Sequence, residues 1–486
     1  MESLFERNVV GIDDRTKRAV ALNYGARTFE MFIFFMNTIV MAHLLTPRDF
    51  GVLAMVSPIL WILAQFGDLG LGSATLQERE LDAERATVLV LVNMAAGVVL
   101  GCVFLACSGL LGAFYGEPDA GHAAAALSSV FFISGVSAVQ IALLRRAFRY
   151  RALICAQATA AMTSFLLALA VALGGGGYWA LVARTVADPL VLAILVWTLA
   201  PWRLRRPRWL PETKRLLRYG AYQAASSSLN AGGRQIDHVL IGWRQGSIDL
   251  GHYALAYRLF YLPVQLIAWP LGHVMVPTLS RLRDDPEQLV AWYVAGLRWV
   301  GLVAFPLFFS VAVCAPDIVA VVAGPQWVHS GDLLRILAPV GALQVCIAAA
   351  EWLLQAHGRS DRAFRLASVT TASSAAAFLV GLPWGAQGVA YGLAAVSLLL
   401  AGPSFAYSIR GTAVSGREVV AALMPSALFG AATALVVHAA RTTVLAEWAP
   451  IGRVALCAVI GAAALAAASA WMRGRKPRGL AECAAG

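Results

Sequence analysis

Apolar runs of about 20 residues recur along the whole chain, separated by short polar segments, and this pattern limits the fold more than any other feature. A helix of about 20 residues spans the hydrocarbon core of a bilayer, whereas a spanning β-strand needs only about 10 residues. Charged residues make up only 13% of the 486 residues, too few to cover the surface of a soluble protein. The sequence therefore predicts an all-α integral membrane protein.

The lengths of the apolar runs predict fourteen transmembrane helices. These cover residues 20–44, 51–76, 87–114, 122–144, 152–173, 177–200, 216–241, 251–279, 288–314, 330–355, 363–383, 385–409, 418–440 and 451–472. The span at 216–241 is the least hydrophobic because it carries several polar residues, including Arg234 and Asp237.

Basic residues alternate between the two sides of the predicted membrane. With the N-terminus in the cytoplasm, the inner segments carry 28 Lys and Arg, and the outer loops carry only Arg48, Arg244 and Arg441. Such asymmetry orients membrane proteins with their basic loops inside. It predicts cytoplasmic N- and C-termini. Nucleic acid is not an expected partner, because the basic residues are scattered through short loops without a folded basic domain.

Short motifs recur in the same order in the two halves, about 195 to 216 residues apart. YGA at 24–26 returns at 219–221, RDFGVLA at 48–54 resembles IDLGHYALA at 248–256, and RAFR at 146–149 returns at 362–365. Six helices separate the copies, so both enter the membrane in the same direction. This predicts two parallel six-helix lobes with a substrate site between them. The expected organisation is an N-terminal segment (1–19), an N-lobe (20–200), a basic linker (201–215), a C-lobe (216–409), two further helices (410–472) and a C-terminal tail (473–486).

Polar residues gather on one face of the first helix of each proposed lobe. Gln223, Ser227, Asn230, Arg234 and Asp237 follow a helical spacing in the second lobe, and Asn23, Arg27, Glu30 and Asn37 lie on the first helix of the first lobe. A charge at mid-bilayer costs about 2.5–3.5 kcal/mol, so such residues are expected to face water or one another. The predicted substrate-binding cavity comprises Arg27, Glu30, Asn37, Asp68, Arg184, Asp188, Gln223, Asn230, Arg234, Asp237, Tyr257, Arg258 and Arg298.

Two interpretations of these charges stay open. Local ion pairs are possible where an acid lies within one turn, as for Arg27 with Glu30, Arg184 with Asp188, and Arg234 with Asp237. Arg258 and Arg298 have no acidic residue within one turn. Guanidinium groups bind phosphate oxygens bidentately, so an excess of arginine favours a cavity for an anionic solute.

Motifs for catalysis and metal binding are missing from the sequence. It contains no GxxxxGK[ST], HExxH or GxSxG motif, and its seven cysteines lack metal-ligand spacing. We therefore expect neither an enzyme nor a bound metal or cofactor. GGGG at 174–177 is interpreted as a tight outer turn.

Several motifs together resemble one family of membrane transporters. LLTPRDFGVLAM (44–55), FGDLGLGSATLQ (66–77), GGGGYWALVAR (174–184), DHVLIG (237–242), LGHYALAYRLFYLPVQ (250–265) and APDIVAVVAGPQW (315–327) resemble bacterial polysaccharide exporters. These belong to the multidrug/oligosaccharidyl-lipid/polysaccharide exporter superfamily, and the nearest branch is that of the O-antigen and colanic-acid flippases.

This resemblance implies a V-shaped pair of lobes in the bacterial inner membrane that flips an undecaprenyl-pyrophosphate-linked oligosaccharide by alternating access. It also implies that the charged residues of the central cavity are Arg27, Glu30, Arg234, Asp237, Arg258 and Arg298. The implied partners are the lipid-linked glycan, the bilayer, and a polysaccharide polymerase with its chain-length regulator. Candidate energy sources are the membrane potential, H⁺ or Na⁺. A drug or other lipid exporter of the same fold, or a non-transporting subunit of a polysaccharide assembly complex, remains an alternative.

Overall fold

The computed structural model describes residues 32–67, 83–147, 149–199, 205, 235–443 and 448–473. Within these ranges the chain is almost entirely helical and contains no β-strand. Ten helical segments of the described residues are long and apolar enough to cross a bilayer. The predicted all-α membrane fold is therefore confirmed.

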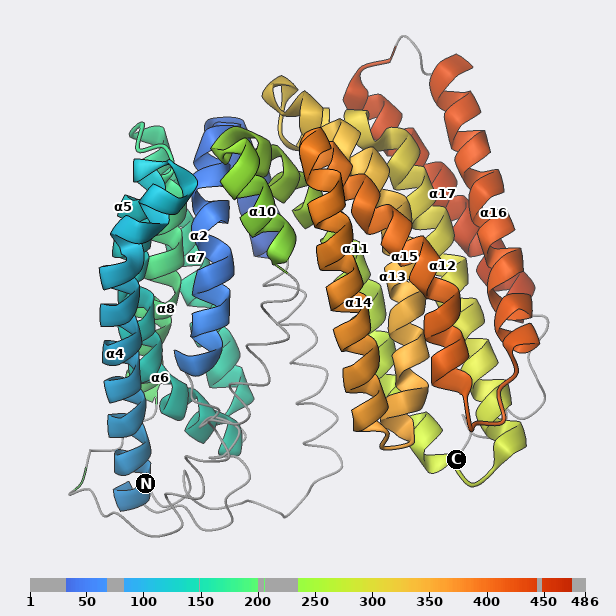
Figure 1. Cartoon of the computed structure of the whole chain (residues 1–486), viewed down its shortest axis with the longest axis horizontal. Coiled ribbons are helices and arrows are strands. Elements are labelled where there is room, and N and C mark those ends of the chain that lie inside the picture. The colour runs from blue at the N-terminus through green and yellow to red at the C-terminus, as the bar shows by residue number, and fades with distance from the viewer. Residues whose placement is uncertain are drawn as a thin grey trace. The chain divides into compact units, whose positions relative to one another are not determined.

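The described helices belong to two compact units, one ending at Gly251 and the other beginning at His252. The first unit contains helix Phe32–Leu44, α2 (Pro47–Gly67), α4 (Ala83–Tyr115), α5 (Pro118–Leu127), α6 (Ser129–Arg146), α7 (Tyr150–Leu173), α8 (Trp179–Leu199) and α10 (Ile236–Gln245) (Figure 1). The boundary between the units falls inside α11 (Ser247–Arg281).

The second unit continues from α11 through the C-terminal half of the chain. It contains α12 (Pro286–Val322), η2 (Pro325–Trp327), α13 (Val328–Ala356), α14 (Ser360–Gly381), η3 (Leu382–Trp384), α15 (Gly385–Ile409), α16 (Gly416–Thr443) and α17 (Pro450–Arg473). The two predicted C-terminal spans, 418–440 and 451–472, correspond to α16 and α17.

The predicted spans agree with the observed helices, with one interruption. The run predicted as one helix at 122–144 is divided at Ser128 into α5 and α6. The hydroxyl groups of Ser128 and Ser129 donate hydrogen bonds to the carbonyls of Ala125 and Ala126, at 2.6 and 2.7 Å. Serine hydroxyls that bond back to the preceding turn compete with the helical ladder and bend helices.

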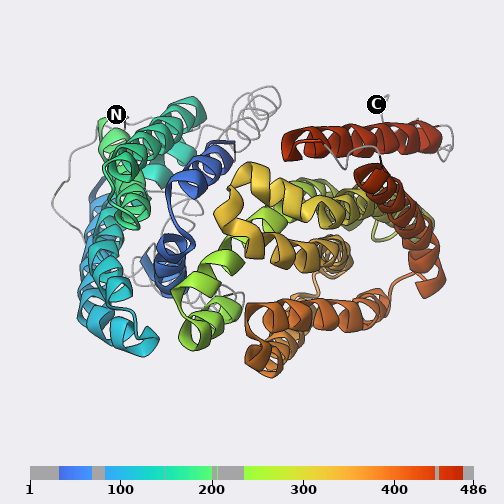
Figure 2. The same ribbon diagram turned by 90° about the horizontal axis from the view of Figure 1, so that it is seen from above.

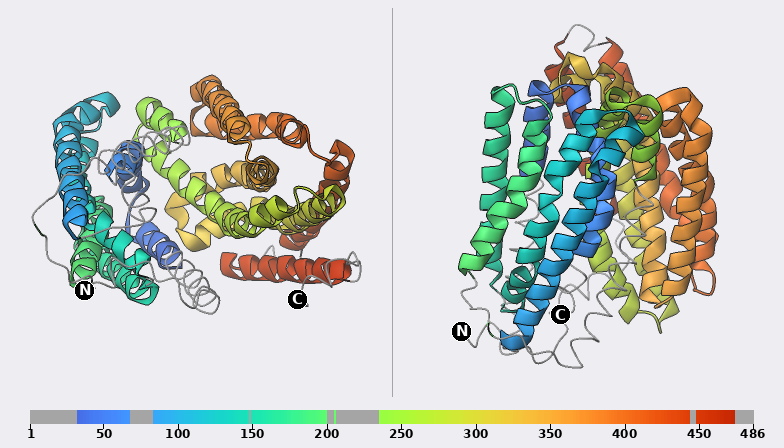
Figure 3. Two further views of the ribbon diagram at one scale, coloured as in Figure 1. Left: turned by 90° about the horizontal axis from the view of Figure 1, so that it is seen from below. Right: turned by 60° about the vertical axis from the view of Figure 1, so that its left-hand side comes forward.

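Glycines allow two helices of the first unit to pack with their backbones in contact. A methyl group on Gly97 of α4 would lie 2.6 Å from the carbonyl oxygen of Phe131 on α6. The reciprocal methyl group on Gly135 would lie 2.6 Å from the carbonyl oxygen of Asn93. Small residues permit such close approach in membrane helices. Figure 3 shows α4 lying along α5 and α6.

In the second unit, α13, α16 and α17 all pack against α12 (Figure 2). Cys314 of α12, Val437 of α16 and Cys457 of α17 form one buried apolar cluster. Next to them, Asp317 is buried and forms ion pairs with Arg441 of α16 (2.5 Å) and Arg453 of α17 (3.3 Å). This carboxylate thus connects both C-terminal helices to α12.

The predicted boundary between the lobes, at 201–215, stays a prediction. Residues 206–234 are outside the described ranges, so of the span predicted at 216–241 only the part in α10 is described. That part lies in the unit that ends at Gly251.

Candidate functional site

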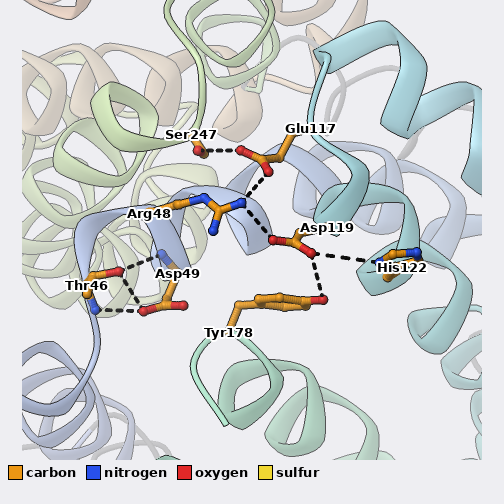
Figure 4. A network of polar contacts seen from close by, with 8 residues as sticks. All are labelled: Thr46, Arg48, Asp49, Glu117, Asp119, His122, Tyr178 and Ser247. Carbon is orange, nitrogen blue, oxygen red and sulfur yellow. Dashed lines mark hydrogen bonds and ion pairs between the residues drawn. The ribbon is translucent and has the colours of Figure 1, made fainter. Parts of the chain in front are cut away.

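A polar cluster connects four segments at the predicted outer end of the first unit (Figure 4). It starts at the N-terminus of α2, in the sequence TPRD. The backbone N–H and the hydroxyl of Thr46 both donate to one carboxylate oxygen of Asp49, at 2.8 and 2.7 Å. Such a reciprocal cap satisfies backbone groups that the first helical turn leaves unpaired. It also fixes the start of α2, from which Arg48 extends.

Arg48 bridges two carboxylates at the start of α5. Its guanidinium lies 2.6 Å from Glu117 Oε1 and 2.8 Å from Asp119 Oδ2. Glu117 occupies the N-cap position before Pro118, yet its side chain makes no capping hydrogen bond, which leaves it available to Arg48. One of the three predicted outer basic residues is therefore neutralised by two acids.

The turn between α7 and α8 contributes Tyr178. Gly175 and Gly177 adopt φ angles of 77° and 54°, which glycine tolerates far better than other residues, and the predicted tight glycine turn is confirmed. The hydroxyl of Tyr178 donates to Asp119 Oδ1 at 3.3 Å. Partial burial, followed by the charge and hydrogen bond of Asp119, raises the pKa of Tyr178 above its usual value.

Ser247, the first residue of α11, completes the cluster. Its hydroxyl donates a 2.9 Å hydrogen bond to Glu117 Oε2. Behind this contact α2 and the start of α11 touch through glycines: a methyl group on Gly51 would lie 1.7 Å from the carbonyl oxygen of Ser247, and one on Gly251 would lie 1.8 Å from that of Pro47. The segment 236–251 is therefore in backbone contact with α2 at these glycines and is connected to the start of α5 by the hydrogen bond of Ser247.

The cluster brings together motifs that are distant in the sequence. RDFGVLA supplies Arg48 and Asp49, YGEP supplies Glu117, the glycine turn supplies Tyr178, and Ser247 precedes IDLG. RDFGVLA, IDLGHYALA and the glycine turn stand out in the sequence, but their residues were not predicted as a site. The signal was present in the repeat, since RDFGVLA begins at Arg48 and IDLGHYALA begins next to Ser247.

Three predicted cavity residues of the first unit lie on helix Phe32–Leu44 and on α8. Asn37 is 1% exposed, and its side-chain oxygen has no hydrogen-bond partner among the described residues. The Arg184 guanidinium carbon lies 5.6 Å from the centre of the Phe34 ring, and its buried Nε is also unpaired in the described structure. Buried polar groups without partners are rare and each requires an explanation, such as a ligand or water.

Arg184 and Asp188, which were predicted to pair, both lie in the described part of the chain but form no ion pair within 4.0 Å. Asp188 Oδ1 instead accepts a hydrogen bond from Ser164 of α7, at 3.3 Å. The guanidinium of Arg184 thus lies over Phe34 with no carboxylate of the described residues within 4.0 Å, although the charge of Asp188 still acts on it at longer range.

Asp237 lies in the first turn of α10 and is 2% exposed. Its Oδ1 accepts the backbone N–H of His238 at 2.8 Å and lies 3.0 Å from Nδ1 of the same histidine. The predicted pairing with Arg234 lies outside the described residues. Five other predicted cavity residues also lie outside the described ranges: Arg27, Glu30, Asp68, Gln223 and Asn230.

In the second unit, Tyr257 and Arg258 are half-buried neighbours on α11, and Arg298 is exposed on α12. The ring of Tyr257 stacks on that of Tyr261, with centroids 5.7 Å apart, and lies 5.9 Å from that of Tyr253. Tyr253, Tyr257 and Tyr261 therefore form a continuous row on α11. Assignment of these residues to a substrate cavity remains a prediction.

One buried charge was missed altogether. Asp317 lies within the motif APDIVAVVAGPQW, close to the end of a predicted span, and it was not identified as a charge within a span. Its partners, Arg441 and Arg453, are 124 and 136 residues away in the sequence. The described residues contain no group of three or more metal-ligating side chains.

A comparison with known families tests the resemblance that the sequence motifs suggest. A model of a family described as "Polysaccharide biosynthesis protein" matches residues 40–332, which is more than half of the chain. The chain belongs to this polysaccharide biosynthesis family. The resemblance inferred from the sequence motifs is thereby confirmed.

Relatives within the polysaccharide biosynthesis family are distant. The teichuronic acid biosynthesis protein TuaB of Bacillus subtilis is 25% identical over 305 residues, covering 61% of this chain and 62% of that protein. The lipopolysaccharide biosynthesis protein WzxC of Escherichia coli is 24% identical over 367 residues, or 74% of each chain. The succinoglycan biosynthesis transport protein ExoT of Rhizobium meliloti is 23% identical, covering 63% of this chain and 62% of that protein.

Solved structures with the same fold include transporters. The lipid II flippase MurJ, in an inward closed conformation, matches with a TM-score of 0.75 at 11% identity and covers 93% of this chain and 98% of its own. An inward-facing multidrug transporter of the MATE family matches with a TM-score of 0.63 at 15% identity, over 82% and 96% of the two chains. At these identities the similarity establishes the fold alone.

Proposed function

We propose that this member of the family is a flippase. It moves an undecaprenyl-pyrophosphate-linked oligosaccharide repeat unit from the cytoplasmic to the periplasmic leaflet of the bacterial inner membrane for cell-surface or exopolysaccharide synthesis. The observation that carries the proposal is the family match over residues 40–332. The names of the relatives, which refer to lipopolysaccharide biosynthesis and succinoglycan transport, point to the same class of substrate.

The polar groups inside the spanning helices suit this substrate. Among the described residues, Arg184 of α8 keeps an unpaired, buried Nε, and Asn37 of helix Phe32–Leu44 in the same unit keeps an unpaired, buried side-chain oxygen. A guanidinium binds the oxygens of a pyrophosphate, and amide and aromatic groups bind sugar hydroxyls and rings. The row of tyrosines on α11, next to Arg258, extends this chemistry to the second unit.

Alternating access requires contacts at the outer end that form and break in each cycle. The contact of α2 with residues 236–251 has suitable properties, because the glycines Gly51 and Gly251 place backbone against backbone. The hydrogen bond of Ser247 with the Glu117 carboxylate contributes about 1.5–3 kcal/mol, and both groups can bind water when the contact opens. This contact would close the outer side while substrate enters from the cytoplasm.

The membrane potential is the simplest source of energy for this transport. A pyrophosphate diester carries about two negative charges, and moving each outward gains about 2.3 kcal/mol per 100 mV when the inside is negative. Antiport of H⁺ or Na⁺ is the rival source. A polysaccharide polymerase and a chain-length regulator are the expected partners, because they would use the flipped repeat unit.

Cells that lack this protein provide the first test. Lipid-linked repeat units should accumulate on the cytoplasmic leaflet, and surface polysaccharide should fall while the lipid carrier is still glycosylated. A strain that loses the polysaccharide without accumulating the lipid-linked precursor would instead support the alternative of a non-transporting assembly subunit. Normal polysaccharide combined with loss of drug resistance would support a drug exporter.

A further inference from the structure

Three loops of the second unit meet at the predicted cytoplasmic end of its helices and line a cavity that is open to one side. They join α11 to α12 (282–285), α13 to α14 (357–359) and α15 to α16 (410–415). The cavity has a volume of about 430 Å³, and its lining includes Arg283, Asp284, His357, Arg359, Gly411 and Ala413. This volume lies within the range of small-molecule binding sites.

Arg359 gives the cavity a fixed positive charge. Its Nη1 donates to the carbonyl of Arg410 at 2.7 Å and its Nη2 to that of Gly411 at 2.9 Å. Gly411 has a φ of 74°, a conformation suited to glycine, which turns its carbonyl toward the guanidinium. Two neutral carbonyls hold this group in place, and no carboxylate of the described residues forms an ion pair with it.

Arg283 is a second cation whose hydrogen-bond donors are not used by the described chain. Its Nε lies 4.0 Å from Asp284 Oδ1, which is too long for a hydrogen bond, and the side chain of Asp284 is 97% exposed. The next carboxylate, Asp285, caps α12 by accepting from the backbone N–H of Gln288 at 3.1 Å and from its side-chain amide at 2.8 Å. The acids of this loop therefore neutralise Arg283 only weakly.

His357 lies in the lining as well. Its Nδ1 lies 2.8 Å from the carbonyl oxygen of Leu353, and because a carbonyl only accepts, Nδ1 carries the hydrogen. This hydrogen bond fixes the orientation of the ring at the end of α13.

We propose that this cavity binds a phosphate ester, supplied either by the headgroup of an anionic phospholipid or by a small soluble phosphate. Guanidinium groups match the geometry of phosphate oxygens, and basic residues at the cytoplasmic surface attract anionic lipids. The helix that follows the cavity loop, α16, exposes Val420 and Met424 one turn apart, a surface on which an acyl chain could lie. This site is independent of the oligosaccharide route proposed above.

Binding can be measured with the full-length protein in neutral detergent micelles. The probes are short-chain phosphatidylglycerol, short-chain phosphatidylcholine and sn-glycerol 3-phosphate, with affinity determined from the shift in thermal unfolding. Arg283→Gln should weaken phosphatidylglycerol binding about tenfold, because it removes a charge-assisted contact. Arg365→Gln is the matched control: Arg365 is 73% exposed, lies at the same end of the unit, and pairs weakly with Asp361 at 4.0 Å.

Ala413→Phe fills the cavity without changing its charge and should also weaken binding. Preference for phosphatidylglycerol over glycerol 3-phosphate identifies the lipid headgroup as the ligand, and equal binding of the two identifies a soluble phosphate. The proposal is overturned if neither probe binds, if phosphatidylcholine binds as tightly as phosphatidylglycerol, or if Arg365→Gln weakens binding as much as Arg283→Gln.

Discussion

The Ser247 hydroxyl lies 2.9 Å from Glu117 Oε2, although the two residues are 130 positions apart in the sequence. Glu117 is the N-cap residue directly before α5, and Ser247 is the first residue of α11, which leads into the second unit. Because Arg48 of α2 binds the other oxygen of the same carboxylate, one side chain connects three helices at the predicted outer end.

A covalent link across this contact should stop transport. In a chain without its native cysteines, Glu117→Cys and Ser247→Cys would be joined by a short bifunctional thiol reagent. Export should cease after cross-linking and return after cleavage of a reducible linker, because the outer contact could no longer open. Export by fully cross-linked protein at the rate of the untreated protein would show that this contact does not open in the cycle.

Alanine at Gly51 or Gly251 should displace the start of α11. The added methyl group would lie less than 2 Å from a backbone carbonyl oxygen, so the helices must separate. We expect a loss of about 1–3 kcal/mol of stability, measured by thermal unfolding. Gly109→Ala is the control, because nothing lies within 4 Å of the added methyl group and alanine favours the helix. Equal stability of all three variants would contradict the close contact.

Most described helix ends could be predicted from the sequence to within a few residues, because the thickness of the bilayer sets the length of each apolar run. The predicted span 385–409 and α15 have the same ends, whereas α12 continues to Val322, beyond the predicted end at 314. The predicted span 122–144 lies within one apolar segment, Pro118–Arg146, and hydropathy does not indicate the turn at Ser128 that separates α5 from α6.

The site was less predictable, because its partners are distant in the sequence. Spacing within one helix suggested an ion pair of Arg184 with Asp188, yet Arg184 lies over the Phe34 ring and Asp188 accepts a hydrogen bond from Ser164, both on other helices. The same reasoning could not pair Arg48 with Glu117, 69 residues away. Periodicity reports which residues share a face of a helix, and only the packing of helices decides what that face meets.

Tyr178→Phe should change how stability depends on alkaline pH. The pKa of Tyr178 is raised in the folded protein, so its contribution to stability is complete below the pKa of the unfolded chain and is lost as pH rises through the folded value. Between about pH 8 and pH 11, the free energy of unfolding should therefore fall more steeply with pH for the native protein than for Tyr178→Phe. Identical slopes for the two proteins would contradict the hydrogen bond of Tyr178 with Asp119.

Asp317→Asn should loosen both C-terminal helices. It leaves Arg441 and Arg453 half-buried without their carboxylate, and breaking a buried ion pair costs about 3–5 kcal/mol. We expect a clear fall in the thermal midpoint and faster proteolysis of α16 and α17. Addition of Arg441→Gln should destabilise the protein by less than the sum of the single changes, because the residues share one network. Strict additivity would argue against the triad.

Alanine substitutions should distinguish arginines that take part in transport from an exposed arginine that does not, by their effect on export. Arg184→Ala, Arg258→Ala and Arg298→Ala are each expected to abolish export while the protein still inserts normally, because each removes a cation from the proposed route of the pyrophosphate. Arg365→Ala, a change to an exposed arginine, should leave export unaffected. If the first three variants export at the native rate, the anion cavity is misplaced.

Flipping in reconstituted vesicles tests the central claim most directly. Purified protein would be placed in vesicles with an undecaprenyl-pyrophosphate-linked repeat unit, and its arrival in the opposite leaflet would be followed with a membrane-impermeant sugar-modifying enzyme. We predict transfer that requires the protein, is lost in Arg184→Ala, and accelerates when the potential favours outward movement of negative charge. Vesicles in which the lipid-linked sugar stays in its original leaflet, with folded protein and any ion gradient supplied, would contradict the assignment as a flippase.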